Sequence, residues 1–232
     1  MTAHAFNLAD RYQTPVILLT DQHMASSYID AERFDLSQIE IDRGQLLTGS
    51  NLKQSKSYQR YENTDSGVSP RALPGGKALV VADADEHNAG GHLIEDARTR
   101  LEQMTKRMQK LDGVSAEALP PKIFPQKGAA TTLVGWGSTY AAIREAVETL
   151  RKEGADVCHL HLSQLWPFPA NEVNRMLRTS ERIIAVESNA SGQMAQLLRS
   201  QTGIEVTGSI LKFDGRPFTP RIIVERFKKE FA

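Results

Sequence analysis

The sequence predicts an α/β fold, in which a mostly parallel sheet carries helices on both of its faces. From residue 131 onward, short apolar runs alternate with stretches of helical periodicity. Such alternation is typical of parallel strands joined by crossover helices. The chain has 232 residues, which is enough for one or two domains.

Composition narrows the function classes. Lysine and arginine number 28 together, as do aspartate and glutamate, so no net field attracts the chain to nucleic acid or an acidic membrane. The single Cys158 allows no internal disulfide and cannot alone hold an iron–sulfur cluster. The sequence shows neither a signal-peptide pattern nor an apolar run of membrane-spanning length. We therefore expect a cytoplasmic protein without nucleic-acid or membrane partners.

The first 29 residues resemble half of an α/β unit. Ala5, Leu8, Ala9 and Tyr12 share one face of a short predicted helix. The apolar run Pro15–Thr20 is typical of a buried parallel strand. From about residue 30 to 77 the sequence is polar and turn-rich, and its scattered apolar side chains indicate an arm lying on another surface.

A helix is predicted over about residues 94–111, where apolar side chains recur at spacings of three and four. This apolar seam consists of Ile94, Ala97, Leu101, Met104, Met108 and Leu111. The basic residues of the helix, Lys106 among them, are expected to face solvent. Asp112-Gly113 is expected to end it, and a proline-rich connector follows over residues 119–125.

Residues 128–232 carry a regular alternation and are expected to fold as one domain. Strands are predicted at 131–136, 156–162, 182–187 and near 204–206. Helices are predicted at 138–153, 170–179, 191–200 and from residue 220, where Thr219 is a natural N-cap before Pro220.

A glycine-rich turn, Gly135-Trp-Gly-Ser138, joins the first of these strands to its helix. Strand-to-helix turns of this kind can hold a phosphate. This one lacks the third glycine of the dinucleotide fingerprint and the lysine of a P-loop. We favour a tight turn in which Ser138 caps the helix, with phosphate binding as the alternative.

Five further residues are candidates for a binding site. Glu187 and Asn189 follow a buried strand at the sheet edge where α/β proteins bind ligands, although capping also explains Asn189. Ser69-Pro-Arg71 could present a guanidinium to a carboxylate or phosphate, or form a plain turn. His87 lies in a loop rich in histidine and carboxylates whose spacing matches no standard metal motif. We predict neither a metal site nor a catalytic residue on this chain.

Six segments together resemble one known family over nearly the whole chain. They are Ala5–Gln22, Asp65–Gly75, Asp83–His87 with Gly91-His92, His161–Pro169, Val186–Gln193 and Gly215–Pro220. In this order they resemble the alpha subunit of 2-oxoacid:ferredoxin oxidoreductases, most closely the 2-oxoglutarate type.

The resemblance implies oxidative decarboxylation of a 2-oxoacid to acyl-CoA. Such enzymes use thiamine diphosphate with magnesium, pass electrons through an iron–sulfur cluster to ferredoxin, and transfer the acyl group to coenzyme A. A beta subunit carries the diphosphate site and the cluster, so no cofactor is expected on this chain alone. By the same resemblance, residues 1–29 are the tail of an aminopyrimidine-binding domain and 30–127 a connecting arm. Residues 128–232 are similar to the carboxyl-terminal domain of transketolase.

One catalytic group of the family has no match here. Its glutamate, which hydrogen-bonds the aminopyrimidine ring, precedes the strand matched by residues 15–20, whereas the first glutamate here is Glu32. Either Met1 is a truncated start or another polypeptide supplies this acid. The chain is then inactive alone, with Ser69, Arg71 and His87 lining a substrate or coenzyme A approach in the complex. A stand-alone, non-catalytic α/β binding or interaction module is the alternative.

Overall fold

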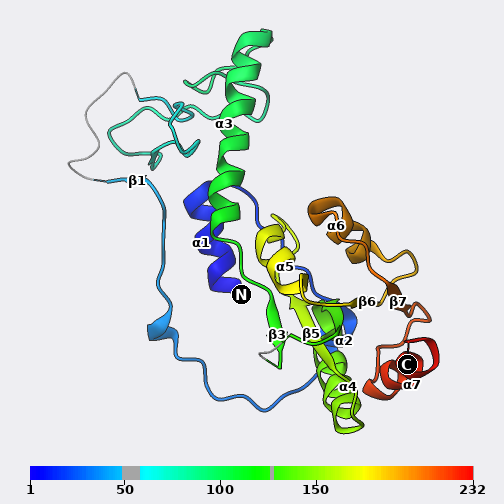
Figure 1. Cartoon of the computed structure of the whole chain (residues 1–232). Helices are drawn as coiled ribbons and strands as arrows, with labels where there is room; N and C mark the ends of the chain where they lie inside the picture. Colours follow the sequence, from blue (N-terminus) through cyan, green and yellow to red (C-terminus); the bar gives the residue numbers. More distant parts are fainter. Residues whose placement is uncertain (49–57, 126–127, 232) are drawn as a thin grey trace. The chain divides into compact units, whose positions relative to one another are not determined.

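The computed structural model describes residues 1–48, 58–125 and 128–231, which divide into two compact units (Figure 1). We call Met1–Leu18 with Ala31–Glu117 the arm unit, and Leu19–Asp30 with Ala118–Ala232 the sheet unit. The boundaries after residues 29 and 127 were expected from the resemblance to domains of a known family, not from compactness, and they stay a prediction.

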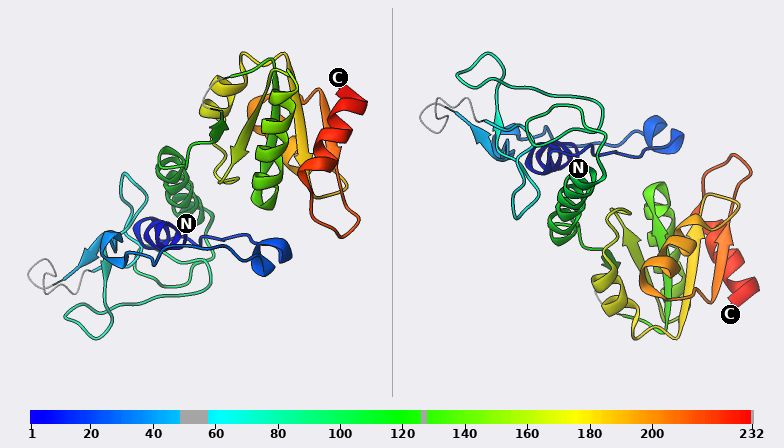
Figure 2. Two further views of the ribbon diagram at one scale, coloured as in Figure 1. Left: turned by 90° about the horizontal axis from the view of Figure 1, so that it is seen from below. Right: turned by 90° about the horizontal axis from the view of Figure 1, so that it is seen from above.

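The sheet unit is built on a five-stranded sheet of order β3-β5-β4-β6-β7 (Figure 2). Its strands are β3 (Lys122–Phe124), β4 (Thr131–Trp136), β5 (Val157–Leu162), β6 (Arg182–Glu187) and β7 (Gly208–Leu211). Strands β4 to β7 pair in parallel, whereas β3 runs antiparallel to β5 at one edge. The predicted mostly parallel sheet is confirmed.

Helices cover both faces of this sheet, as predicted. The helices of the unit are α2 (Gln22–Ser26), α4 (Tyr140–Lys152), α5 (Ala170–Leu177), α6 (Gln193–Thr202) and α7 (Pro220–Phe231). Successive strand residues point to opposite faces, so Leu133 packs with Ile143 of α4 and Ile223 of α7. Val134 packs on the other face, in a cluster with Val173 of α5 and Leu198 of α6.

The last strand, β7, lies four residues beyond its predicted place. Strand β7 begins at Gly208, where an added Cβ would come within 2.3 Å of the Phe231 ring of α7. The apolar residues Ile204 and Val206, which suggested the strand, instead pack against the α5 and α6 side of the sheet as a connection. The prediction was wrong because Gly208 and Ser209, the first two residues of the strand, carry no apolar signal.

The arm unit is held by a small core around two helices. Its elements are α1 (Thr2–Tyr12), the 3₁₀ turn η1 (Leu36–Gln38), β1 (Leu46–Leu47), β2 (Arg71–Ala72) and α3 (Ala97–Ala116). Strands β1 and β2 are parallel. Leu8 and Tyr12 of α1 pack with Val68 and Val114, so the predicted apolar face of α1 is confirmed.

Helix α3 differs from its predicted form in length and in its buried face. It continues through Gly113, where the Tyr12 ring fills the space that a Cβ would need, at 2.5 Å. Its buried side chains include Gln103 and Lys106, whereas Leu101 of the predicted seam is 68% exposed. The prediction that the basic residues of α3 face solvent is therefore wrong for Lys106.

Residues 15–20 do not form the predicted buried strand. The structure assigns no strand there, and Ile17 and Leu19 are 80% and 68% exposed. A strand is stabilised by pairing, and among the described residues no strand pairs with this segment.

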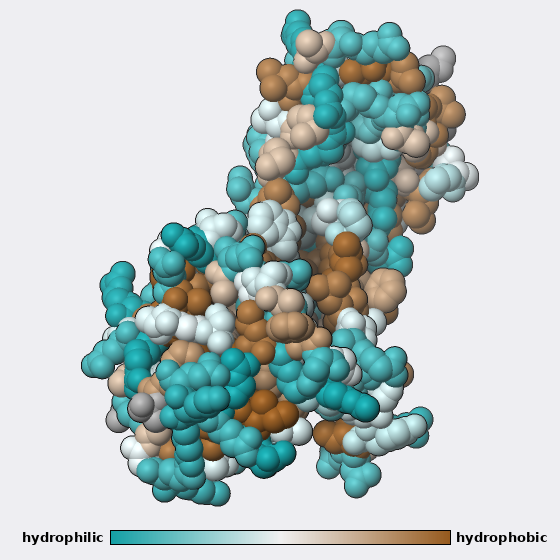
Figure 3. Space-filling model, turned by 90° about the vertical axis from the view of Figure 1, so that its right-hand side faces the viewer, coloured by the Kyte–Doolittle hydropathy of each residue, from teal (hydrophilic) through white to brown (hydrophobic). Residues whose placement is uncertain are grey.

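The face shown in Figure 3 carries apolar patches among polar surface. In the part of the chain that the structure describes, no helix is long and apolar enough to cross a membrane.

Candidate functional site

Ser69 is buried in a turn of the arm unit. Its Oγ donates to the carbonyl oxygen of Glu62 at 2.9 Å, and its own carbonyl accepts from Gln13 Nε2 at 2.6 Å. Gln13 follows α1 in the left-handed region, at φ 50°. The hydroxyl is thus engaged in the fold, and Gln13 ties this turn to the end of α1.

Arg71 lies on β2, where Leu46↔Arg71 pairing fixes its backbone. Its two terminal nitrogens are each 3.3 Å from Asp10 Oδ1, and Arg43 Nε is 2.8 Å from Asp10 Oδ2. Two guanidinium groups share this one carboxylate, and the two carboxylates that pair with the neighbouring Arg11 balance the charge of the group. The Arg71 side chain is 24% exposed, and its buried Nε has no partner among the described residues. This arrangement suits an anionic ligand.

His87 is buried against Tyr61, with ring centroids 3.6 Å apart and an interplanar angle of 22°. Its Nδ1 lies 3.1 Å from the Asn88 carbonyl oxygen, so Nδ1 carries the proton in that contact. An isolated bridge to Leu93 closes the loop. The ring is therefore fixed by stacking and by one hydrogen bond.

Three cationic side chains, Arg60, Lys106 and Lys110, connect these candidates. Arg60 donates to Gln13 Oε1 at 2.9 Å and lies over the Tyr61 ring, so it joins the Ser69 turn to the His87 stack. Burial, followed by repulsion from Lys110 and Arg60, lowers the pKa of Lys106 to about 8. Burial, followed by repulsion from Arg60, also lowers the pKa of Lys110. Sequence reasoning missed this group, because Arg60 is distant in sequence and the lysines resembled a solvated helix face.

Glu187 and Asn189, at the edge of the sheet, cap helix α6. The fully buried Glu187 carboxylate accepts from the backbone N–H groups of Met194 at 2.8 Å and Ala195 at 3.0 Å. Asn189 Nδ2 donates to the same carboxylate at 2.8 Å, and its Oδ1 accepts from Gly192 N at 2.7 Å. These bonds satisfy the free N–H groups of a helix start. A ligand-binding role at this edge stays a prediction.

The Gly135–Ser138 turn is shaped by packing. A Cβ at Gly135 would lie 2.2 Å from Ile143 Cδ1, and Gly137 adopts φ +57°. The 3₁₀ turn η3 (Gly137–Thr139) precedes α4, whose N-cap is Thr139. Ser138 instead donates its hydroxyl to the Asp21 carboxylate, so the prediction that Ser138 caps the helix is wrong. Packing therefore explains the glycine at position 135, and the positive φ explains the glycine at position 137.

Two buried histidines, His159 and His161, lie on β5. The sequence analysis named neither as a candidate site residue. Neither ring nitrogen of His159 has a hydrogen-bond partner among the described residues, nor does His161 Nδ1. Burial, with a smaller contribution from His161, lowers the pKa of His159 to about 3. Burial and then Lys122 lower the pKa of His161 to about 4. Both rings are therefore neutral at pH 7, and they pack on Tyr140 of α4.

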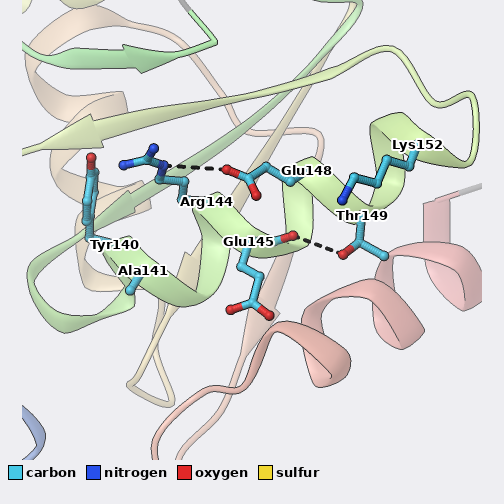
Figure 4. Close-up of a pocket in the computed structure, with 7 residues that line it drawn as sticks. All are labelled: Tyr140, Ala141, Arg144, Glu145, Glu148, Thr149 and Lys152. Atoms are coloured by element: carbon cyan, nitrogen blue, oxygen red, sulfur yellow. Dashed lines mark hydrogen bonds and ion pairs between the residues drawn. The ribbon is translucent and has the colours of Figure 1, made fainter.

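The depressions near these residues are shallow. One of ≈ 390 Å³ is lined by Phe124, Tyr140 and His159, among others. A second, of ≈ 470 Å³, runs along the outer side of α4 (Figure 4). There Arg144 pairs with Glu148 at 3.7 Å, as solvated helix faces commonly do. Within residues 1–48, 58–125 and 128–231, no three His, Cys, Asp or Glu side chains gather as a metal site would require.

Comparison with known protein families first identifies the class of domain to which most of the sheet unit is similar. Residues 129–223 match the family described as pyruvate:ferredoxin oxidoreductase core domain II. This match covers β4 to the start of α7, which is most of the sheet unit.

Relatives are similar over more of the chain. The 2-oxoacid:ferredoxin oxidoreductase 2 alpha subunit of Aeropyrum pernix is 40% identical over 219 residues, or 92% of this chain and 33% of the relative. The corresponding 2-oxoacid:ferredoxin oxidoreductase 1 alpha subunit of Sulfurisphaera tokodaii is 36% identical over 220 residues, or 92% of this chain and 34% of the relative. The chain is therefore homologous to 2-oxoacid:ferredoxin oxidoreductase alpha subunits, and the resemblance seen in the sequence is confirmed. It spans about a third of the length of these curated relatives.

A solved structure supports the same homology. The 2-oxoglutarate:ferredoxin oxidoreductase of Magnetococcus marinus, determined with 2-oxoglutarate, coenzyme A and succinyl-CoA bound, superposes with a TM-score of 0.87 and 31% identity. The match covers 97% of this chain and 39% of that chain. Both units described above thus have counterparts in one polypeptide of an oxidoreductase.

Proposed function

We propose that this chain is part of the alpha subunit of a thiamine-diphosphate-dependent 2-oxoacid:ferredoxin oxidoreductase, with 2-oxoglutarate as the expected substrate. The observation that carries this proposal is the structural match over 97% of the chain to an enzyme of that activity. In the proposed cytoplasmic complex, a beta subunit provides the diphosphate, magnesium and iron–sulfur sites. The products are acyl-CoA, carbon dioxide and reduced ferredoxin.

The residues of this chain do not make a thiamine site by themselves. The family's aminopyrimidine-binding glutamate would precede residues 15–20, and no glutamate occurs before Glu32, which is exposed on the arm unit. This chain is therefore proposed to take no direct part in the chemical step. Its proposed contribution is assembly and the shaping of the approaches to the active site.

Ser69, Arg71 and His87 are the proposed lining of a substrate or coenzyme A approach. Supporting this role, the partly exposed Arg71 guanidinium, whose Nε has no partner among the described residues, suits carboxylates and phosphates, the anionic groups of the two substrates. Ser69, two residues before Arg71, is linked through Gln13 to Arg60, and His87 stacks on the neighbouring Tyr61 ring.

The proposed function is tested by assaying 2-oxoglutarate-dependent reduction of a viologen dye with coenzyme A present. The purified chain alone should show no turnover. Co-purification with a beta subunit and a polypeptide supplying the aminopyrimidine domain should restore it. Turnover by the chain alone would contradict the proposal. A chain that joins no such complex would instead be the stand-alone binding or interaction module.

Replacing Arg71 by Ala in the complete complex should raise the apparent KM for 2-oxoacid or coenzyme A about tenfold, the effect of losing one charge-assisted contact of about 1.4 kcal/mol. The turnover number should change little. Arg98→Ala is the matched control, because Arg98 is an exposed cation of the arm unit that pairs with Glu102 and lies outside this group. Equal effects of the two substitutions, or unchanged kinetics in Arg71→Ala, would return Arg71 to a structural role in its turn.

A further inference from the structure

The three cations of the arm unit converge on one aromatic ring and one glutamine. Arg60 Cζ lies 5.0 Å from the Tyr61 ring centroid and Lys106 Nζ lies 5.7 Å from it. Lys110 Nζ donates to the Gln13 carbonyl oxygen at 3.2 Å, while Arg60 holds the Gln13 side chain. Contacts through Tyr61 and Gln13 therefore bring three positive charges, from two segments of the chain, into one place.

The acids around this group do not neutralise it. Glu86 is already shared by Arg100 and Arg107. Glu62 attracts Lys106 only from a distance, and among the described residues none of the three cations forms an ion pair. Gly49–Ser57, outside the described residues, contains two lysines and neither aspartate nor glutamate. Among the described residues, the group therefore keeps an excess of positive charge.

Keeping these charges together costs stability. Lys106 is only 6% exposed, and lysine is seldom buried unless it is paired. Lys106 and Lys110 are four residues apart on α3, where like charges repel. Burial first, and repulsion from neighbouring cations second, lowers the pKa of both ammonium groups. The contact of Lys106 with the Tyr61 ring offsets only a part of this free-energy cost, since cation–π contacts contribute about 0.5–2 kcal/mol. A bound anion would remove the repulsion.

We propose that Arg60, Lys106 and Lys110 bind a phosphate group of a small-molecule ligand. A phosphate carries about −1.5 to −2 charges and three acceptor oxygens, which matches one guanidinium and two ammonium groups better than a single carboxylate does. The recessed position of Lys106 favours a small, highly charged group over the flat surface of another protein. Phosphate binding here goes beyond the proposed function and does not require the oxidoreductase reaction. The phosphate belongs either to a nucleotide or to free inorganic phosphate.

Calorimetric titration of the full chain at pH 7 and low ionic strength tests this site. The probes are inorganic phosphate, ADP, a polyglutamate peptide and, as the uncharged comparison, adenosine. We expect phosphate or ADP to bind and adenosine not to bind. Lys106→Met, which keeps the length of the side chain and removes its charge, should weaken binding at least tenfold. Arg98→Gln is the control, because Arg98 is an exposed cation of the same helix paired with Glu102.

A second measurement separates ligand binding from a structural role. Lys106→Met should slow hydrogen exchange of the α3 amides in the absence of ligand, because it removes a buried charge. Phosphate should slow the same amides in the unsubstituted chain. If Lys106→Met fails to fold, Lys110→Gln replaces it in both experiments. The proposal would be overturned if Lys106→Met and Lys110→Gln each made α3 exchange faster without ligand. It would also be overturned if the substituted chain bound phosphate as tightly as the unsubstituted chain.

The probes also identify the source of the phosphate. Tighter binding of ADP than of phosphate indicates a nucleotide, whereas equal affinity indicates free phosphate. Binding of a polyglutamate peptide by a chain that takes up neither small anion would overturn the proposal in favour of an acidic protein partner. All these measurements are made without turnover, so their failure leaves the proposed oxidoreductase function untouched.

Discussion

Lowering the pH from 7 to 5 should destabilise the sheet unit by about 4 kcal/mol through His159 and His161, about 2 kcal/mol for each histidine. In the folded chain their pKa values are about 3 and about 4, so both remain neutral at pH 5. In the unfolded chain each takes up a proton below its ordinary pKa of about 6.5. The unfolded state therefore binds more protons throughout this range, and stability falls as the pH falls.

Tryptophan fluorescence during urea unfolding measures this loss selectively, because both tryptophans of the chain, Trp136 and Trp166, belong to the sheet unit. His159→Leu should remove about half of the pH dependence. His92→Gln, at an exposed histidine of the arm unit, should leave it unchanged. A His159→Leu protein with the pH dependence of the unsubstituted chain would show that another group is responsible.

Replacing Gly135 by Ala should destabilise the sheet unit by about 1–3 kcal/mol, the usual cost of overpacking a core. The new Cβ would lie 2.2 Å from Ile143 Cδ1 and 2.9 Å from Thr139 Oγ1. Ile143 is fully buried, so its methyl group has no empty space to enter. The same fluorescence assay gives the free energy of unfolding.

A double-mutant cycle identifies the cause. Ile143→Val removes the clashing methyl group, and in that background the cost of Gly135→Ala should fall. Gly137→Ala is the comparison, because Gly137 has φ +57° and a Cβ added there would meet nothing within 4 Å, so its cost is purely conformational. Its cost should be the same with either residue at position 143. A cost of Gly135→Ala that Ile143→Val does not reduce would contradict the packing role.

The central strands were predicted from the sequence with their bounds. Thr131–Trp136 and Arg182–Glu187 are the residues of β4 and β6. Both are apolar runs of strand length rich in β-branched residues, and turn residues bound them, so local pattern and tertiary position agree. Pro220 likewise marks the start of α7, because proline at the first helical position lacks only a hydrogen bond that no helix start can form.

The remaining features depend on contacts that the local pattern does not contain. The pattern assumes that apolar side chains are buried, whereas in α3 Lys106 is buried and Leu101 is exposed. Of the site, the sequence indicated Ser69, Arg71 and His87 singly. It did not indicate Gln13 and Tyr61, which connect them through long-range contacts. The histidines of β5 were hidden because they occur within an apolar run.

The exposed segment Val16–Leu19 has a consequence for the chain as a molecule in the cell. Unpaired backbone beside uncharged, branched side chains is a template for strands of other molecules, including further copies of itself. For a newly made chain, folding therefore competes with self-association through this segment, and the outcome depends on concentration. Covering or pairing this segment would therefore protect the chain as effectively as an additional stabilising contact.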